Sequence, residues 1–290
     1  MEQLTQLAQF LVAGATLGAV YAVVALGFTI IFNVTGIINF AQGEFVMLGG
    51  MLSFWFYAGL GLPLVVAFAL AVLCTALVGL GLDRLAIRPA RNAPVLSLII
   101  LTIGASIFIR GLAGQAWGKN AVPLPAFSGE EPLYLGGVTV LPQTLWVLGT
   151  TLLAMGLLHL LLTYTMLGKA LRACAINRRS AALVGIDAQL MSAVSFGLSA
   201  FLGAVGGIVI APLALTSYDA GTMLGVKGFA AAAVGGFGSQ LGAVAGGLAL
   251  GLLESLGAGY VSSAYKDAIA LAALFLALFV RARRTGEVGE

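Results

Sequence analysis

The chain has 290 residues, of which 60% are hydrophobic and only 9% are charged, whereas an ordinary soluble domain carries about 25% charged residues. Exposing so much hydrocarbon to water costs about 25 cal/mol per Å², so a soluble globule is excluded and lipid must be the solvent. The formal net charge of +3 is spread over short loops rather than one patch, which argues against a nucleic-acid partner.

Apolar runs follow one another along the whole sequence, and each is long enough to exclude a β-barrel strand. They occupy residues 7–32, 36–57, 63–82, 95–112, 141–162, 189–211, 223–237, 240–258 and 266–280. We therefore predict an all-α integral membrane protein, a polytopic helical bundle of about eight or nine segments in one transmembrane domain covering 1–290. No Lys or Arg precedes the first run, so we expect a retained helix rather than a cleaved signal.

Ten of the 14 basic residues lie in three clusters, which are Arg84, Arg88 and Arg91; Lys169, Arg172, Arg178 and Arg179; and Arg281, Arg283 and Arg284. If these clusters face the cytoplasm, the N-terminus lies outside, the C-terminus inside, and the number of crossings is odd. Nine segments satisfy this condition. Run 223–237 rises only about 22 Å against a core of roughly 30 Å, so we predict that it is broken or re-entrant.

The longest hydrophilic stretch, about 114–140, falls outside under this topology and contains Glu130, Glu131 and three prolines. It is either a docking surface for an extracytoplasmic partner or a solvated connector. Glycine makes up 40 residues, and pairs with small-xxx-small spacing predict close helix packing at Gly14/Gly18, Gly203/Gly207, Gly242/Gly246 and Gly247/Gly251. An echo between 39–43 and 227–230 suggests two internal repeats, inverted ones if the crossing count is odd.

Polar side chains at membrane depth mark the stretch that contains Asn39, Gln42 and Glu44. A charged side chain there costs roughly 2.5 to 3.5 kcal/mol unless it faces a partner or a watery cavity, so these residues are candidates for a substrate pathway. Lys227 and Glu254 are further candidates, and either could pair with Glu44. The competing interpretation is that the polar groups only hydrogen-bond neighbouring helices or cap a broken one.

The loop 163–187 is basic, rich in alanine and free of proline. Leu167, Leu171 and Cys174 have helical spacing, which predicts a short amphipathic cytoplasmic helix, and Gly168 and Gly185 would let the chain turn in and out. The alternative is a loop that lies on anionic headgroups. We find neither a G-x-x-x-x-G-K-[ST] loop nor G-x-S-x-G, H-E-x-x-H or metal-ligand spacing, so we expect no catalysis, cofactor or metal in this chain.

Four stretches together resemble one known family, the LivH-type permeases of branched-chain amino-acid ABC importers. They are TLGAVYAVVALGFTIIFNVTGIINFAQGEFVMLGG, RACAINRRSAALVGID, VKGFAAAAVGGFGSQLGAVAGGLALGLLES and AYKDAI. The resemblance covers most of the chain outside 114–140. By position it implies an ATPase-coupling segment at Arg172, Ala173, Asn177, Arg178, Arg179 and Gly185. Relatives carry histidine where this chain has Gln42, which puts a titrating role at that position in doubt.

The resemblance further implies a subunit of the bacterial or archaeal cytoplasmic membrane. Its partners would be a second, LivM-like permease or a second copy, two cytoplasmic ATPases that bind ATP and Mg, an extracytoplasmic substrate-binding protein and membrane lipid. Branched-chain amino acids are the expected substrates, with urea or short amides as alternatives. An ion- or proton-coupled transporter or channel that uses Glu44 and Glu254, and a purely structural scaffold, are the competing functions.

Overall fold

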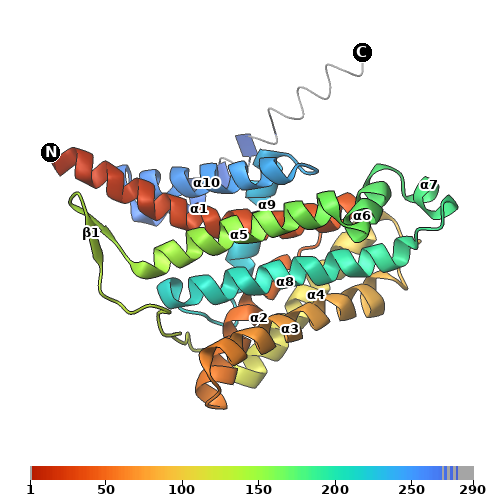
Figure 1. Ribbon diagram of the computed structural model, residues 1–290, viewed down its shortest axis with the longest axis horizontal. Helices are drawn as coiled ribbons and strands as arrows, with labels where there is room; N and C mark the ends of the chain where they lie inside the picture. Colours follow the sequence, from red (N-terminus) through yellow and green to blue (C-terminus); the bar gives the residue numbers. More distant parts are fainter. Residues whose placement is uncertain (1, 270, 273–274, 277–278, 280–290) are drawn as a thin grey trace.

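The computed structural model describes residues 2–269, 271–272, 275–276 and 279 and shows a bundle of long helices (Figure 1). The helices are α1 Glu2–Thr35, α2 Gln42–Phe54, α3 Leu64–Leu82, α4 Val95–Trp117, α5 Pro142–Tyr164, α6 Met166–Ile176, α7 Arg178–Leu183, α8 Ala188–Ala214, α9 Ala220–Gly235 and α10 Gln240–Tyr260. Turns of π-helix extend α2 over Trp55–Gly59 and α3 over Asp83–Ile87, and a 3-10 turn covers Ser263–Tyr265. Strands β1 Leu133–Leu135 and β2 Val138–Val140 form an antiparallel hairpin.

Six helices in the described residues are long and apolar enough to cross a membrane, namely α1, α3, α4, α5, α8 and α10. The prediction of a polytopic all-α membrane protein is therefore confirmed. Helices α2 and α9 have only 13 and 16 residues, which confirms that some segments are broken. Most of the last predicted run, 266–280, lies outside the described residues.

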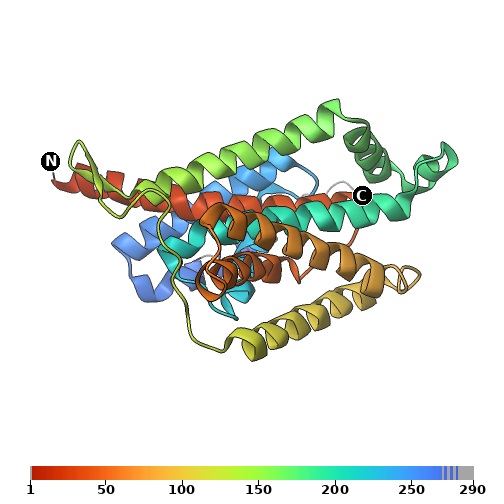
Figure 2. The ribbon, with the colours of Figure 1, turned by 60° about the horizontal axis from the view of Figure 1, so that its bottom comes forward.

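The loops gather at two opposite ends of the bundle (Figures 1 and 2). The hairpin lies beside the start of α1, where the Gln9 amide donates to the Thr139 carbonyl at 2.9 Å and accepts the Thr139 N–H at 3.0 Å. Helices α6 and α7 project from the other end. Arg88 of the first basic loop and Arg178 of α7 line one small cavity there, so these two basic loops share an end. This separation is the one that a positive-inside topology requires.

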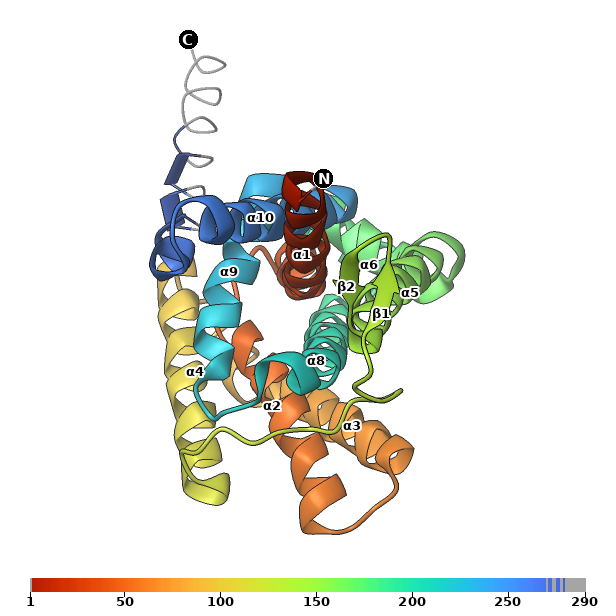
Figure 3. The ribbon, with the colours of Figure 1, turned by 90° about the vertical axis from the view of Figure 1, so that its left-hand side faces the viewer.

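Glycines bring the backbones of α1 and α10 into direct contact. A Cβ atom on Gly18 would lie 2.8 Å from the Cα of Leu248, and one on Gly251 would lie 2.2 Å from the Gly18 nitrogen. Gly14 faces the same helix at Leu252. The predicted use of Gly14/Gly18 and of the glycines of α10 in close packing is thus confirmed. Seen along the bundle, α9 lies between α10 and α2 (Figure 3), and a hydrogen bond from Arg110 to Thr222 joins α4 to α9.

Candidate functional site

The first broken helix begins inside the bundle, where six non-helical residues separate α1 from α2. Gly36 has a φ of +73°, a conformation that glycine adopts without a Cβ penalty, and α1 ends there. The Asn39 side-chain oxygen accepts the Ala41 N–H at 3.1 Å, and the Thr102 hydroxyl of α4 accepts the Phe40 N–H at 3.1 Å. Non-helical backbone at membrane depth is tolerated because these protein groups satisfy it. Asn39 is fully buried, and its Nδ2 has no hydrogen-bond partner among the described residues.

Gln42 points into the bundle and joins three helices. Its amide donates to the Ser199 carbonyl of α8 at 3.2 Å, and its oxygen faces the Ser199 hydroxyl, which also lies 2.9 Å from the Gly27 carbonyl of α1. A Cβ atom on Gly27 would lie 2.1 Å from the Gln42 nitrogen. Gln42 therefore makes the interhelical hydrogen bonds of the competing interpretation, and they suit an amide without a titrating group.

Glu44 points to the opposite side of α2, toward α4 and α9. The side chain is 1% exposed, and its Oε1 accepts the Ser106 hydroxyl of α4 at 2.9 Å. Its Oε2 lies over Gly221 and meets no donor at bonding geometry within the described ranges. Arg110 and Asp219 are the charged groups that act on this carboxylate, and the Thr222 hydroxyl lies near it. Glu44 is thus buried beside groups of both signs.

The two short helices cross where each of them begins. A Cβ atom on Gly43 would lie 2.0 Å from the Gly221 carbonyl, and one on Gly221 would lie 2.6 Å from the Gly43 carbonyl. In both places a long helix, a short non-helical turn and a short helix follow one another, as α1 and α2 or as α8 and α9. This reciprocal contact supports an internal repeat. The second helix break lies before Ala220, at the start of α9. The sequence similarity at Lys227–Ala230 lies inside α9 and so does not mark this break.

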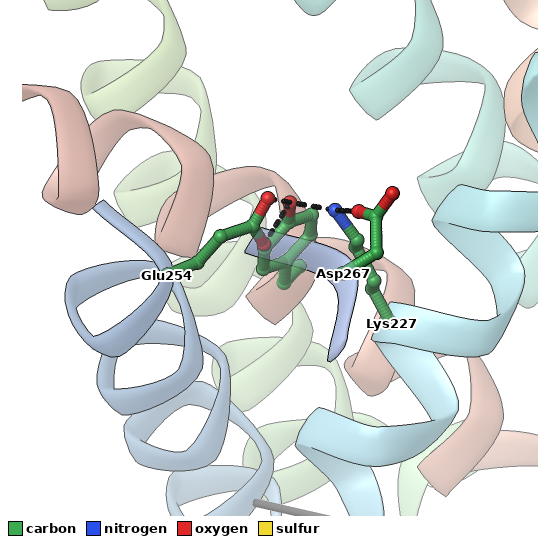
Figure 4. Close-up of polar contacts among 4 residues, drawn as sticks. Lys227, Glu254 and Asp267 are labelled. Carbon is green, nitrogen blue, oxygen red and sulfur yellow. Dashed lines mark hydrogen bonds and ion pairs between the residues drawn. The ribbon is translucent and has the colours of Figure 1, made fainter. Parts of the chain in front are cut away.

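Lys227 pairs with Glu254 rather than with Glu44. Lys227 Nζ lies 2.7 Å from Glu254 Oε1 and 2.8 Å from Asp267 Oδ1 (Figure 4). The Tyr21 hydroxyl of α1 donates to Glu254 Oε2 at 2.8 Å, and Lys227 also lies 5.5 Å from the Tyr21 ring centre. Lys227 and Glu254 are 6% and 3% exposed, so this pair joins α9 to α10 and α1 deep in the protein. The network therefore links α1, α9 and α10 through buried polar groups.

The predicted coupling segment is two helices, not one. Asn177 ends α6 and caps α7, because its side-chain oxygen accepts the N–H groups of Arg179 and Ser180, each at 3.0 Å. Leu171 and Cys174 are buried as the helical spacing predicts, but Leu167 is 38% exposed. Gly185 has a φ of +88° and turns the chain, as expected. Gly168 lies in the first turn of α6, where a Cβ atom would lie 2.1 Å from the Leu161 carbonyl oxygen, so its missing side chain lets α6 turn back against the end of α5, as expected.

A small polar cavity of about 60 Å³ connects the two basic loops. Asp83 at the end of α3, Arg88 and Arg178 line it, and the Ser192 hydroxyl of α8 donates to Asp83 at 2.5 Å. Arg178 also donates to the Ala188 carbonyl at 3.2 Å. Arg178 of α7 thus contacts the start of α8 and lies beside the end of α3.

Asp187 caps the first turn of α8 just beyond Gly185. Its carboxylate accepts the N–H groups of Gln189 at 2.8 Å and Leu190 at 3.2 Å. The hydrogen bond from Leu190, and then that from Gln189, hold the pKa of Asp187 below its ordinary value. The negative charge also suits the positive end of the helix dipole.

Comparison with known proteins places this geometry in a family. Residues 10–278 match the family model described as "Branched-chain amino acid transport system / permease component". The chain belongs to this permease family. It is 36% identical to the high-affinity branched-chain amino acid transport system permease protein LivH of Escherichia coli (strain K12), over 96% of this chain and 95% of the relative. It is 34% identical to the corresponding protein BraD of Pseudomonas aeruginosa, over 100% of this chain and 98% of the relative.

A solved structure shares the fold of this permease. A chain of PsaBC from Streptococcus pneumoniae, solved in complex with a Fab, superposes with a TM-score of 0.50 at 14% identity, over 93% of this chain and 91% of that chain. The predicted family and the helical permease fold are therefore confirmed.

Several residues of the site escaped the sequence interpretation. Ser106 and Thr222 carry hydroxyl groups that are common in membrane helices, so neither gave a signal on its own. Arg110 did carry a sequence signal, because an arginine inside the apolar run 95–112 is as costly at membrane depth as a carboxylate. Tyr21 became significant only when the structure placed its hydroxyl against Glu254.

Proposed function

We propose that this permease forms the membrane path of an ATP-driven importer for branched-chain or other hydrophobic amino acids, working by alternating access. The substrate class is supported by the names of the relatives LivH and BraD. The observation that supports the ATP-driven mechanism is the α6–α7 projection, to which separate ATPases could bind and so move the membrane helices.

The tip of this projection has the character of a protein-docking surface. Ile176, Leu183 and Val184 are 87%, 88% and 76% exposed, although each is a large apolar side chain. Exposed apolar groups with basic neighbours such as Arg178 and Arg179 are typical of interaction surfaces. We infer that a cytoplasmic ATPase covers this tip and that its motion passes through Arg178 to α8.

The remaining partners follow from the same proposal. The chain has no phosphate-binding loop, so ATP and Mg belong to two partner ATPases. A LivM-like permease or a second copy completes the path, and a substrate-binding protein docks at the opposite end, on the loop about 114–140. The assembly lies in the cytoplasmic membrane of a bacterium or archaeon, with the N-terminus of this chain outside and its C-terminus inside.

The broken helices supply the moving parts. Helices α2 and α9 are joined to long neighbours by short non-helical turns, so each can tilt without bending α1 or α8. Because they cross at Gly43 and Gly221, a tilt of one displaces the other. ATP-driven closure of the ATPases would change this crossing and alter access to the path.

Reconstitution into liposomes with the partner subunits tests the proposal. Leucine uptake should require ATP and should stop when the ATPases are inactivated. Leu183→Asp at the exposed tip should release the ATPases from the purified complex, whereas Leu4→Asp, which is 78% exposed at the other end, should not. The buried carboxylate of Glu44 favours a second candidate, an ion-coupled transporter. Uptake that persists without ATP and collapses with the ion gradient would replace the first function by this one.

A further inference from the structure

A strip of polar groups joins α4 to α2 and α9, and the ribbons of α4 and α9 lie on the same side of the bundle (Figure 3). Glu44 lies beneath it and accepts the Ser106 hydroxyl at 2.9 Å. Further along α4, Arg110 donates through Nη1 to the Thr222 hydroxyl at 2.6 Å, in the first turn of α9. The strip therefore carries one carboxylate and one guanidinium, and the Thr222 hydroxyl interacts with both.

Both charged groups have unused hydrogen-bonding capacity. Glu44 Oε2 is buried and has no donor at bonding geometry in the described part of the chain. Arg110 has five N–H donors and donates one hydrogen bond, to the neutral hydroxyl of Thr222. Arg110 forms no ion pair with the described residues. Opposite charges at membrane depth would be expected to pair directly. Among the described residues no direct ion pair joins them, so each keeps hydrogen-bonding capacity for a ligand that carries the complementary charge.

Apolar side chains flank the strip on the same helix faces. Ile103, Ser106, Ile107 and Arg110 recur at i, i+3, i+4 and i+7 of α4 and so share one face. Ile103 and Ile107 are 41% and 56% exposed, and Met223 of α9, next to Thr222, is 45% exposed. This surface combines two opposite charges with aliphatic contacts. The cost of such charges beside lipid implies that it borders a water-accessible path in the assembled importer.

We propose that Glu44 and Arg110 recognise the α-ammonium and α-carboxylate groups of the transported amino acid, while Ile103, Ile107 and Met223 contact its aliphatic side chain. The inference rests on the proposed function and names the groups that read the substrate. An ammonium group supplies the donors that Glu44 Oε2 lacks, and a carboxylate accepts two parallel N–H bonds from a guanidinium. Asp219, which precedes α9, adds a second negative charge near Glu44 and strengthens attraction of the ammonium.

The test measures leucine transported per ATP hydrolysed in proteoliposomes that contain the complete importer with loaded binding protein. Arg110→Gln and Glu44→Gln should each keep ATP hydrolysis stimulated by the binding protein, but should transport about tenfold to a hundredfold less leucine per ATP, the size expected for a lost charged hydrogen bond. Arg84→Gln and Lys266→Gln remove positive charges from exposed positions outside the loop 114–140 and should behave as wild type.

Several outcomes would overturn the inference. Leucine per ATP within about twofold of wild type in both variants would do so, as would an equal loss in the two control variants. If a neutral variant does not assemble with its ATPases, Arg110→Lys is measured instead. This variant keeps the positive charge but loses the geometry for two parallel hydrogen bonds. Unchanged leucine transport per ATP in Arg110→Lys would then overturn the assignment. Failure of ATP-dependent uptake in the wild-type complex would overturn the proposed function itself. The leucine-per-ATP ratio of the variants tests only the assignment of Glu44 and Arg110, so the two failures can be distinguished.

Discussion

Replacement of Glu254 by glutamine should destabilise the protein through one buried partner, Lys227. The substitution keeps the shape of the side chain and an acceptor for Tyr21 but removes the negative charge 2.7 Å from Lys227 Nζ. Lys227 is 6% exposed, so water cannot replace that charge. Breaking a buried pair costs about 3–5 kcal/mol. Asp267 remains 2.8 Å away, so we expect the lower end, about 3 kcal/mol.

The double variant Lys227→Met/Glu254→Gln separates this cause from lost packing. It leaves neither charge of the pair, and Asp267, whose side chain is 42% exposed, can be solvated. Because replacing both buried charges by groups of similar volume is often neutral, the double variant should recover most of the loss, to within about 1 kcal/mol of wild type.

Unfolding in detergent can be followed with a thiol-reactive fluorescent dye, because Cys174 is only 4% exposed in the folded protein. Glu254→Gln should unfold at the lowest temperature, the double variant near wild type, and the exposed control Glu130→Gln at the wild-type temperature. The reasoning is refuted if Glu254→Gln unfolds with the wild type, or if the double variant is no more stable than the single one.

Three further predictions concern packing, topology and pH. Gly251→Ala places a Cβ atom 2.2 Å from the backbone of α1 and should cost about 1–3 kcal/mol in the same unfolding assay, whereas Gly104→Ala, with nothing within 4 Å, should not destabilise. Single cysteines at Tyr134 and Val184, which are 75% and 76% exposed, should react with a membrane-impermeant maleimide from opposite sides of the membrane in a chain without Cys74 and Cys174; labelling of both from one side contradicts the topology. Asp187 has a lowered pKa, so its contribution to stability is present above its ordinary pKa of about 3.9 and is lost as pH falls through the folded value. The difference in melting temperature between wild type and Asp187→Asn should therefore shrink in acid, and a difference that is constant with pH would exclude this linkage.

Two polar residues of α2, Gln42 and Glu44, show where the sequence was informative and where it was not. Their membrane depth marked both Gln42 and Glu44 as unusual, and both are buried. Since they lie two residues apart on a helix, they face different neighbours: Gln42 faces Ser199 of α8, whereas Glu44 faces Ser106 of α4. The periodicity of α2 alone does not tell which neighbour lies on which side.

Pairing of charges was likewise undecided before the fold was known. Lys227 or Glu254 was expected to pair with Glu44, whereas the packing of α9 on α10 pairs them with each other. Arg110 is the instructive omission, since its membrane depth was readable from the run 95–112. Its relation to Glu44 was not, because those two residues belong to helices whose contact the loop lengths do not specify.

The sequence by itself determined the membrane class, the approximate spans, the presence of broken segments, and the family. It could do so because a bilayer constrains the chain in one dimension, through apolar length and flanking charge. Only the tertiary structure decided that α9 begins at Ala220, that Gly43 and Gly221 cross, and which polar groups meet. Those features depend on which helices pack against each other, and the hydropathy and charge of the sequence do not specify which helices are neighbours.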